Sequence, residues 1–137
     1  MKAISSFRGQ YFFLSNYFPA PVTYQGITFQ NSEAAFQAMK CPSMAAQFAA
    51  LPPDKAKKFG RTVQLRGDWE SVKEQIMYDI CLAKFTQNID LCRMLVATGD
   101  SELIEGNTWN DKCWGVCYGE GENKLGKILM RIREELR

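Results

Sequence analysis

The segment from Asp68 to Gln87 constrains the fold most strongly, because it is the longest continuous helical pattern in the 137-residue chain. It contains neither glycine nor proline. Large or apolar side chains recur along it at helical spacing, at Trp69, Val72, Ile76, Ile80, Ala83 and Gln87. Asp68 is of a residue type that often caps a helix N-terminus. We therefore predict a helix from Asp68 to about Gln87, the longest in the protein.

Proline and glycine divide the rest of the chain into short elements. The stretch VTYQGITF predicts a hairpin that turns at Gln25-Gly26, because Gly26 can adopt a positive φ. Further helices are expected at Ser32 to about Cys41, Ser43–Leu51, Asp54–Phe59, Asp90–Ala97 and Asn123–Leu136. Short strands are expected at Ala3–Phe7, Ser101–Asn107 and Trp114–Gly119. The prediction is a mostly helical α+β fold with a small antiparallel sheet, in a single domain over residues 1–137.

The composition is that of a globular protein, with 46% hydrophobic and 23% charged residues. A net charge of +2 is weak for a dedicated nucleic-acid module. No apolar run approaches the roughly 18 residues of a membrane span. The N-terminal stretch MKAISSFRGQ lacks the apolar core of a secretory signal, so a cytosolic protein with no membrane partner is expected.

The chain has no histidine, which excludes Ser-His, Cys-His and histidine–metal chemistry. Any proton transfer must therefore use carboxylates, lysine, cysteine, tyrosine or water. The five cysteines form no C-x-x-C motif and their number is odd, which favours reduced thiols. Cys113 and Cys117 lie four residues apart without further ligands nearby, so no metal site is predicted.

The helix that begins at NSEAAFQAMK carries a polar row. Glu33, Gln37 and Lys40 follow at i, i+4 and i+7 and share one side of a helix. One interpretation is a solvated face with an ordinary charge pair. The other places the row in a crevice, because the small residues Ala34, Ala35 and Ala38 let neighbouring elements approach closely.

A second polar group lies in the glycine-punctuated stretch NTWNDKCWGVCYGEGENKLGK. Trp109 and Trp114 could form flat apolar walls around the carboxylate of Asp111. Alternatively, both tryptophans are core residues and Asp111 is a turn residue. The glycines before the last helix also permit a phosphate site or a simple flexible turn.

Arg61, Arg66 and Lys84 are further candidates for contacts with a phosphate or carboxylate, although most such side chains simply lie on the surface.

Four blocks in order, FLSNYFPAP, ITFQNSEAAFQAMK, DWESVKEQIMYDICLAKFTQN and WNDKCWGVCYGEGENKLGKILMRIREEL, resemble those of the NADAR (YbiA-like) family over nearly the whole chain. The resemblance implies a compact, mostly helical α+β fold and an N-glycosidase that needs no metal or organic cofactor. It implies cleavage between ribose C1 and an amine of a base. The substrate would be a ribosylamino-pyrimidine phosphate of riboflavin synthesis or ADP-ribosylated guanine in nucleic acid.

Carried over by position, the resemblance assigns catalysis to Glu33, Lys40 and Asp111. It assigns substrate contacts to Ser15, Asn16, Trp109, Trp114 and Asn123, to which the polar row adds Gln37. Many relatives carry His or Tyr where this chain has Ala34 and Ala35, which leaves more room beside Glu33.

Two mechanisms follow from these residues. In one, Glu33 or Asp111 activates water while the other carboxyl group protonates the leaving amine. In the other, Lys40 attacks C1 of the opened sugar and forms a Schiff base, which requires a lowered lysine pKa. Two other classes of function remain as alternatives: a non-catalytic module that binds ADP-ribose, and an accessory protein that binds nucleic acid.

Overall fold

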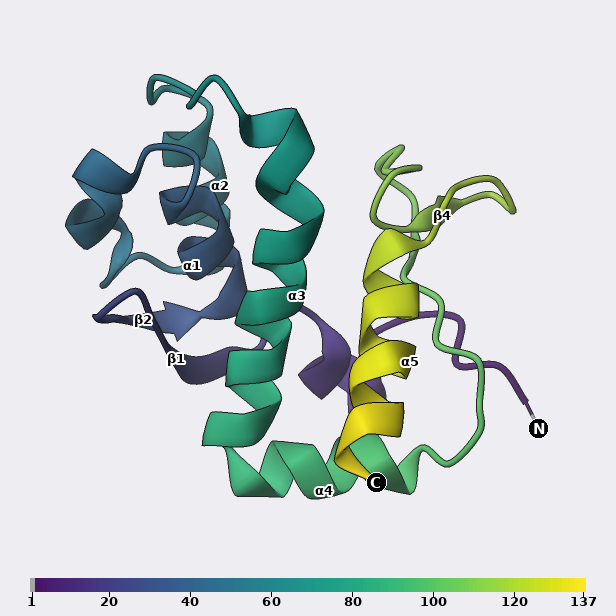
Figure 1. The fold of residues 1–137 in the computed structure, drawn as a ribbon. Helices are drawn as coiled ribbons and strands as arrows, with labels where there is room; N and C mark the ends of the chain where they lie inside the picture. Colours follow the sequence, from purple (N-terminus) through teal and green to yellow (C-terminus); the bar gives the residue numbers. More distant parts are fainter. Residues whose placement is uncertain (1) are drawn as a thin grey trace. The chain divides into compact units, whose positions relative to one another are not determined.

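The computed structural model describes residues 2–137 and divides them into two units. The central unit is formed by Asn16–Asn88, and the terminal unit by residues 2–15 and 89–137. Helices dominate both units, and each contains one two-stranded sheet (Figure 1). The predicted fold class, a mostly helical α+β protein with small sheets, is confirmed.

The central unit begins with an antiparallel hairpin formed by β1 (Pro19–Tyr24) and β2 (Ile27–Asn31). Its turn lies at Gln25 and Gly26, as predicted, with φ angles of 52° and 77°. Alternate residues of the hairpin are buried, and Val22 and Phe29, which pair across the two strands, are completely inaccessible.

Helix α1 (Ser32–Ala38) follows β2 directly. Asn31 is its N-cap, since its side chain accepts a 2.7 Å hydrogen bond from the backbone N–H of Ala34. The helix ends earlier than predicted because the chain tightens, and Lys40 N–H bonds to the carbonyl of Gln37 only three residues back.

Two further short helices follow α1 in the central unit. The 3-10 helix η2 (Pro42–Phe48) replaces the helix predicted over Ser43–Leu51. Helix α2 (Pro53–Gly60) agrees with the prediction within one residue at each end, and it packs against α1. The segment between α2 and the next helix is a loop.

Helix α3 (Trp69–Gln87) is the longest element, as predicted, and packs against α1 and β1 (Figure 1). Asp68 occupies the N-cap position, as predicted, but its side chain makes no cap hydrogen bond and instead pairs with Arg66 at 2.6 Å. The stripe is buried at Trp69, Ile76 and Ile80, but Gln87 is exposed.

The terminal unit contains the 3-10 helix η1 (Gly9–Leu14) and helices α4 (Ile89–Ala97) and α5 (Lys124–Leu136). Its strands β3 (Gly106–Asn107) and β4 (Val116–Cys117) are shorter than predicted, and they pair in parallel rather than antiparallel. The strand predicted over Ala3–Phe7 is reduced to a single bridge between Ile4 and Leu103.

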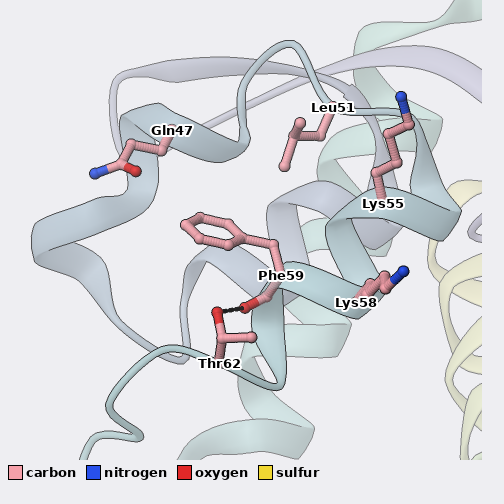
Figure 2. A pocket seen from close by; sticks show the side chains of 6 residues that line it. All are labelled: Gln47, Leu51, Lys55, Lys58, Phe59 and Thr62. Carbon is pink, nitrogen blue, oxygen red and sulfur yellow. Dashed lines mark hydrogen bonds between the residues drawn. The ribbon is translucent and has the colours of Figure 1, made fainter.

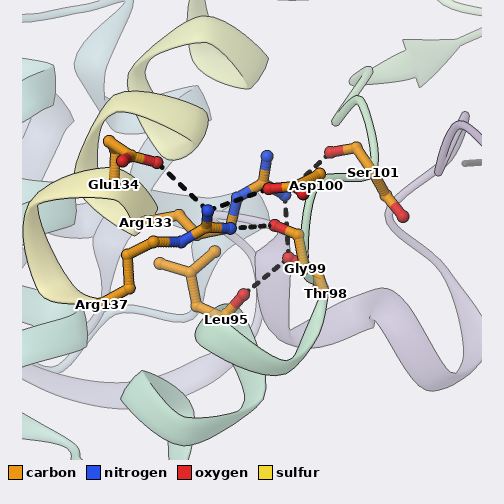
Figure 3. A network of polar contacts seen from close by, with 8 residues as sticks. All are labelled: Leu95, Thr98, Gly99, Asp100, Ser101, Arg133, Glu134 and Arg137. Carbon is orange, nitrogen blue, oxygen red and sulfur yellow. Dashed lines mark hydrogen bonds and ion pairs between the residues drawn. The ribbon is translucent and has the colours of Figure 1, made fainter.

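Helix α5 buries Leu125, Leu129 and Ile132, whereas Ile128 and Leu136 are only half-buried. The helix also buries a charge that its apolar stripe did not predict. Arg133 is 6% exposed and donates hydrogen bonds to Thr98 Oγ1 and to the carbonyl of Ser101, at 3.0 and 2.8 Å (Figure 3).

None of the helices within residues 2–137 combines the length and apolar character needed to cross a membrane.

Candidate functional site

The polar row of α1 does not face open solvent. Gln37 is only 5% exposed, and Glu33 and Lys40 are half-buried. Nε2 of Gln37 donates a 2.7 Å hydrogen bond to Oε2 of Glu33. The amide therefore fixes the orientation of the carboxylate, as the crevice interpretation of this row requires.

Small residues let neighbours come close to this row. Ala34, Ala35 and Ala38 are completely inaccessible on the other sides of α1. Gly60 of α2 comes so close that a Cβ atom there would lie 2.1 Å from Oε1 of Gln37. A larger residue at this position would displace the Gln37 side chain, so the glycine lets the end of α2 lie directly against the row.

Lys40 lies beside an aromatic wall that the sequence did not predict for it. Its Nζ is 5.9 Å from the ring centroid of Trp69, and the Trp69 ring packs against that of Phe36 in a tilted arrangement, with the centroids 5.0 Å apart. Burial is the main cause that lowers the pKa of Lys40, and the cations Arg61 and Lys57 lower it further. Glu33 acts in the opposite direction, since its negative charge favours the protonated amine.

Tyr17 is a neighbour of the polar row that the sequence analysis did not name. Burial raises the pKa of its hydroxyl, and the charges of Glu33 and Asp54 raise it further, against the effect of Arg61. The tyrosine thus lies within the electrostatic reach of the row. Its place beside the SN pair in FLSNYF was the available signal.

Asn16 connects two of the sequence blocks within the central unit. Its backbone carbonyl accepts a 3.1 Å hydrogen bond from the N–H of Glu33, at the first turn of α1. The Asn16 side chain is 8% exposed and donates to Sδ of Met77 on α3 at 3.3 Å. These contacts hold the Asn16 segment against both the first turn of α1 and helix α3.

Asp111 and the two tryptophans belong to the terminal unit. Oδ1 of Asp111 accepts hydrogen bonds from the backbone N–H groups of Cys113 and Trp114, at 3.1 and 3.0 Å. Its carboxylate thus shapes a turn, which is the alternative that the sequence had left open. Trp109 is 52% exposed, with the guanidinium of Arg8 at 5.9 Å, and Trp114 is half-buried.

Asn123 and Ser15, which were also predicted to contact the substrate, lie in the terminal unit. Asn123 is 9% exposed, and its backbone is in the left-handed conformation with φ 52°. Its side chain accepts a hydrogen bond from the N–H of Glu105 and donates one to the carbonyl of Leu103. Ser15 ends η1, where its N–H donates to the carbonyl of Phe12.

Arg66 and Lys84, which were further candidates for contacts with a phosphate or carboxylate, have different surroundings. Arg66 pairs with Asp68 and also donates to the carbonyl of Met39. Lys84 is 1% exposed, and burial lowers its pKa to about 8. Its Nζ lies 5.7 and 5.0 Å from the rings of Phe18 and Phe85.

A hollow of about 440 Å³ lies in the central unit between η2 and α2 (Figure 2). Leu51 and Phe59 give it apolar walls. The remaining lining side chains are those of Gln47, Lys55, Lys58 and Thr62. None of the predicted catalytic residues lines it.

Among residues 2–137, no group of three or more cysteine, aspartate and glutamate side chains is arranged to hold a metal ion. The chemistry open to the row in α1 is that of a carboxylate and an amine, with an amide that orients the carboxylate.

Comparison with known proteins gives the family. Residues 4–137 match the profile of the NADAR domain. The chain is 39% identical over 128 residues to N-glycosidase YbiA of Escherichia coli (strain K12), a match that covers 89% of this chain and 79% of that protein. It is 38% identical over 130 residues to a riboflavin biosynthesis protein of Vibrio vulnificus (strain YJ016), covering 90% of this chain but only 35% of that protein.

The fold agrees with these matches. The NMR structure of the E. coli protein YbiA superposes with a TM-score of 0.86 at 36% sequence identity, covering 99% of this chain and 86% of that chain. The family profile, the sequence relatives and the solved structure agree: the chain belongs to the NADAR domain family of YbiA-like N-glycosidases.

Proposed function

We propose that this protein is an N-glycosidase that hydrolyses the bond between ribose C1 and an amine of a base. The names of its relatives, N-glycosidase and riboflavin biosynthesis protein, support this activity. The substrate is a ribosylamino-pyrimidine phosphate or an ADP-ribosylated guanine, and both present the same bond. The observation that carries the proposal is an oriented carboxylate, Glu33 of α1, whose charge acts on an amine of lowered pKa, Lys40, just beyond the end of the same helix.

In the proposed reaction, Lys40 is the nucleophile. Opening of the ribose ring leaves C1 joined to the base nitrogen as an imine. The neutral amine of Lys40 adds to C1, the base amine leaves, and a Schiff base joins Lys40 to C1. Water then adds to C1 and releases the free sugar and the lysine. Glu33 accepts the proton from the attacking amine and returns it to the leaving amine.

Burial of Lys40 supports this route, because a lysine attacks only in its neutral form. The alternative route uses water directly, with Glu33 as the base that activates it. In that case Lys40 would remain protonated and would contact the substrate as a cation. Asp111, Trp109 and Trp114 stay proposed substrate or acid contacts on the strength of the resemblance.

Offering both substrates to the purified protein and to Glu33→Ala tests the activity, with free base and free sugar phosphate detected by mass spectrometry. We expect release from one substrate by the unmodified protein and a loss of at least a hundredfold in Glu33→Ala. Binding without turnover of either substrate would instead indicate a non-catalytic nucleotide-binding module.

Trapping separates the two routes. Borohydride added during turnover reduces a Schiff base and should leave a sugar adduct on Lys40, located by peptide mass spectrometry. Lys40→Arg keeps the charge but should abolish both the adduct and the activity. An active Lys40→Arg protein without adduct would exclude lysine attack and leave the water route.

A further inference from the structure

Helix α2 presents basic side chains on two different sides. Lys55 and Lys58 line the hollow next to η2, together with Phe59 and Thr62 (Figure 2). Lys57 does not line that hollow. Lys57 and the residue that caps the helix, Arg61, lie four positions apart and therefore share a second side.

The second side of α2 faces the polar row of α1. Gly60 is in direct contact with Gln37, so the end of α2 that carries Arg61 adjoins the Glu33–Gln37 hydrogen bond. The charges of Lys57 and Arg61 both act on Lys40, and Arg61 also acts on the hydroxyl of Tyr17.

Positively charged side chains outnumber negatively charged ones near the polar row. The charges of Glu33, Arg61 and Lys57 all act on Lys40, whereas the acids that act on the neighbouring Tyr17 are Glu33 and Asp54. Within residues 2–137, neither Lys57 nor Arg61 has a side-chain hydrogen bond or an ion pair. Other basic side chains do have acidic partners, as in the pairs Arg66–Asp68, Lys73–Glu70 and Arg137–Asp100.

Three neighbouring cations repel one another, and a bound dianion would relieve that repulsion. Cβ atoms four residues apart on a helix are about 6 Å from each other, which lets two side chains hold one phosphate from two sides. A guanidinium can donate two parallel hydrogen bonds to phosphate oxygens, and an ammonium adds a further charge.

We propose that Arg61 and Lys57 form the phosphate-binding site for the substrate's ribose phosphate and so set C1 of the sugar against Glu33 and Lys40. This inference rests on the proposed function, whose two substrate classes both carry phosphate on the ribose. Arg61 and Lys57 are thus specificity residues, and they select phosphorylated ribosides over neutral ones.

Binding of ribose 5-phosphate and of ribose, measured by calorimetry at low salt, tests this assignment. The unmodified protein should bind ribose 5-phosphate at least tenfold more tightly than ribose. Arg61→Gln and Lys57→Gln should each lose most of that preference. Lys58→Gln makes the same charge change on a side chain that lines the hollow, and the charge of Lys58 is not among those that shift the pKa of Lys40, so this variant should keep the preference. Thermal melts confirm that all variants are folded.

A third ligand, ADP-ribose, distinguishes the source of the phosphate. Tighter binding of ribose 5-phosphate than of ADP-ribose assigns the site to a phosphate monoester, and the reverse assigns it to a pyrophosphate. The proposal is overturned if the unmodified protein does not prefer ribose 5-phosphate, if Arg61→Gln binds it as tightly, or if Lys58→Gln loses as much. These measurements need no turnover, so their result is independent of the Glu33→Ala and Lys40→Arg tests.

Discussion

The amide of Gln37 holds the carboxylate of Glu33 through a 2.7 Å hydrogen bond, one helical turn away on α1. The other amide atom, Oε1, is buried without a hydrogen-bond partner among residues 2–137. The protein therefore accepts an unsatisfied carbonyl, which typically costs about 1–3 kcal/mol, in order to keep this amide next to the carboxylate. That arrangement leads to the first two predictions.

Removing the amide should impair catalysis more than binding. Gln37→Leu takes away a hydrogen bond to a charged group, which is typically worth about 1.5–3 kcal/mol, so kcat should fall roughly ten- to a hundredfold. KM should change little, because the substrate phosphate is held elsewhere. Steady-state kinetics of Gln37→Leu checks this prediction, with the exposed Gln47→Leu as control. An unchanged kcat would show that Glu33 needs no positioning.

Gly60→Ala should disturb the same pair from the opposite side. The new methyl group would overlap Oε1 of Gln37, and overpacking of this kind costs about 1–3 kcal/mol of unfolding free energy. Urea denaturation measures the cost. Gly67→Ala is the matched control, because a Cβ atom there meets no atom within 4 Å. The double variant Gly60→Ala/Gln37→Ala lacks the Gln37 amide that the new methyl group would overlap. Its loss of unfolding free energy should therefore be smaller than the sum of the losses in the two single variants. A loss equal to that sum would refute the contact.

The pH dependence of Schiff-base formation should report the surroundings of Lys40. Burial, Arg61 and Lys57 lower its pKa and Glu33 raises it. Only the neutral amine attacks, so the rate should rise with pH and level off at a pH below the ordinary lysine value. Arg61→Gln and Lys57→Gln each remove a cation, which raises the pKa and moves the rising limb to higher pH. Lys58→Gln should leave the limb in place, as borohydride trapping across pH would show.

Lys84 should make stability depend on pH. Burial lowers its pKa from 10.5 to about 8, so between these values the unfolded chain binds more protons than the folded one. The free energy of unfolding therefore rises with pH across this window, by about 3 kcal/mol in total. Burial also raises the pKa of Cys81 to about 12, which acts in the opposite direction above pH 9.

Comparing Lys84→Met with the unmodified protein cancels the part of the Cys81 contribution that comes from burial, because this thiol is buried in both proteins. Denaturation at pH 7 and at pH 10.5 should show the unmodified protein gaining about 3 kcal/mol relative to the variant. A constant difference between the two proteins would mean that Lys84 keeps an ordinary pKa in the folded state.

Arg133 should stabilise the terminal unit strongly. Arg133→Ala leaves Thr98 and the carbonyl of Ser101 without their donor and should cost about 2–4 kcal/mol. Arg131→Ala, on the same helix, removes an exposed pair with Glu135 and should cost about 0.5 kcal/mol or less. Urea denaturation compares the two variants.

Arg133→Ala also tests the prediction that the chain forms a single domain. With Trp109 and Trp114 replaced by phenylalanine, Trp69 in the central unit is the only remaining tryptophan. If the chain is one domain, Arg133→Ala should shift the unfolding midpoint reported by Trp69 fluorescence. A Trp69 signal that ignores the substitution would show that the two units unfold independently.

Local sequence signals predicted the elements that depend on local chemistry. Gln25-Gly26 gave the hairpin turn, and the uninterrupted pattern after Asp68 gave α3. Contacts between distant residues could not be predicted in this way. The parallel pairing of β3 with β4 is one such contact. The missing side-chain cap has a local cause, since the carboxylate of Asp68 pairs with Arg66 two residues earlier.

The candidate site shows the same division. Helical spacing placed Glu33, Gln37 and Lys40 on one side of α1, but it could not say whether that side was solvated. Trp69 and Tyr17 join the row through tertiary packing and electrostatics, and no spacing rule links them to Lys40. The burial of Lys84 was equally invisible, because an isolated lysine in a helix pattern indicates a surface position.

The thiol of Cys81 provides a built-in reporter for the framework behind Glu33. It lies next to the side chain of Asn16, whose backbone anchors the first turn of α1, and it is 1% exposed. A neutral, enclosed sulfur reacts with an alkylating reagent only when α3 and the Asn16 segment separate. The rate at which iodoacetamide modifies Cys81 would therefore report how often these two segments separate, and no label would have to be introduced.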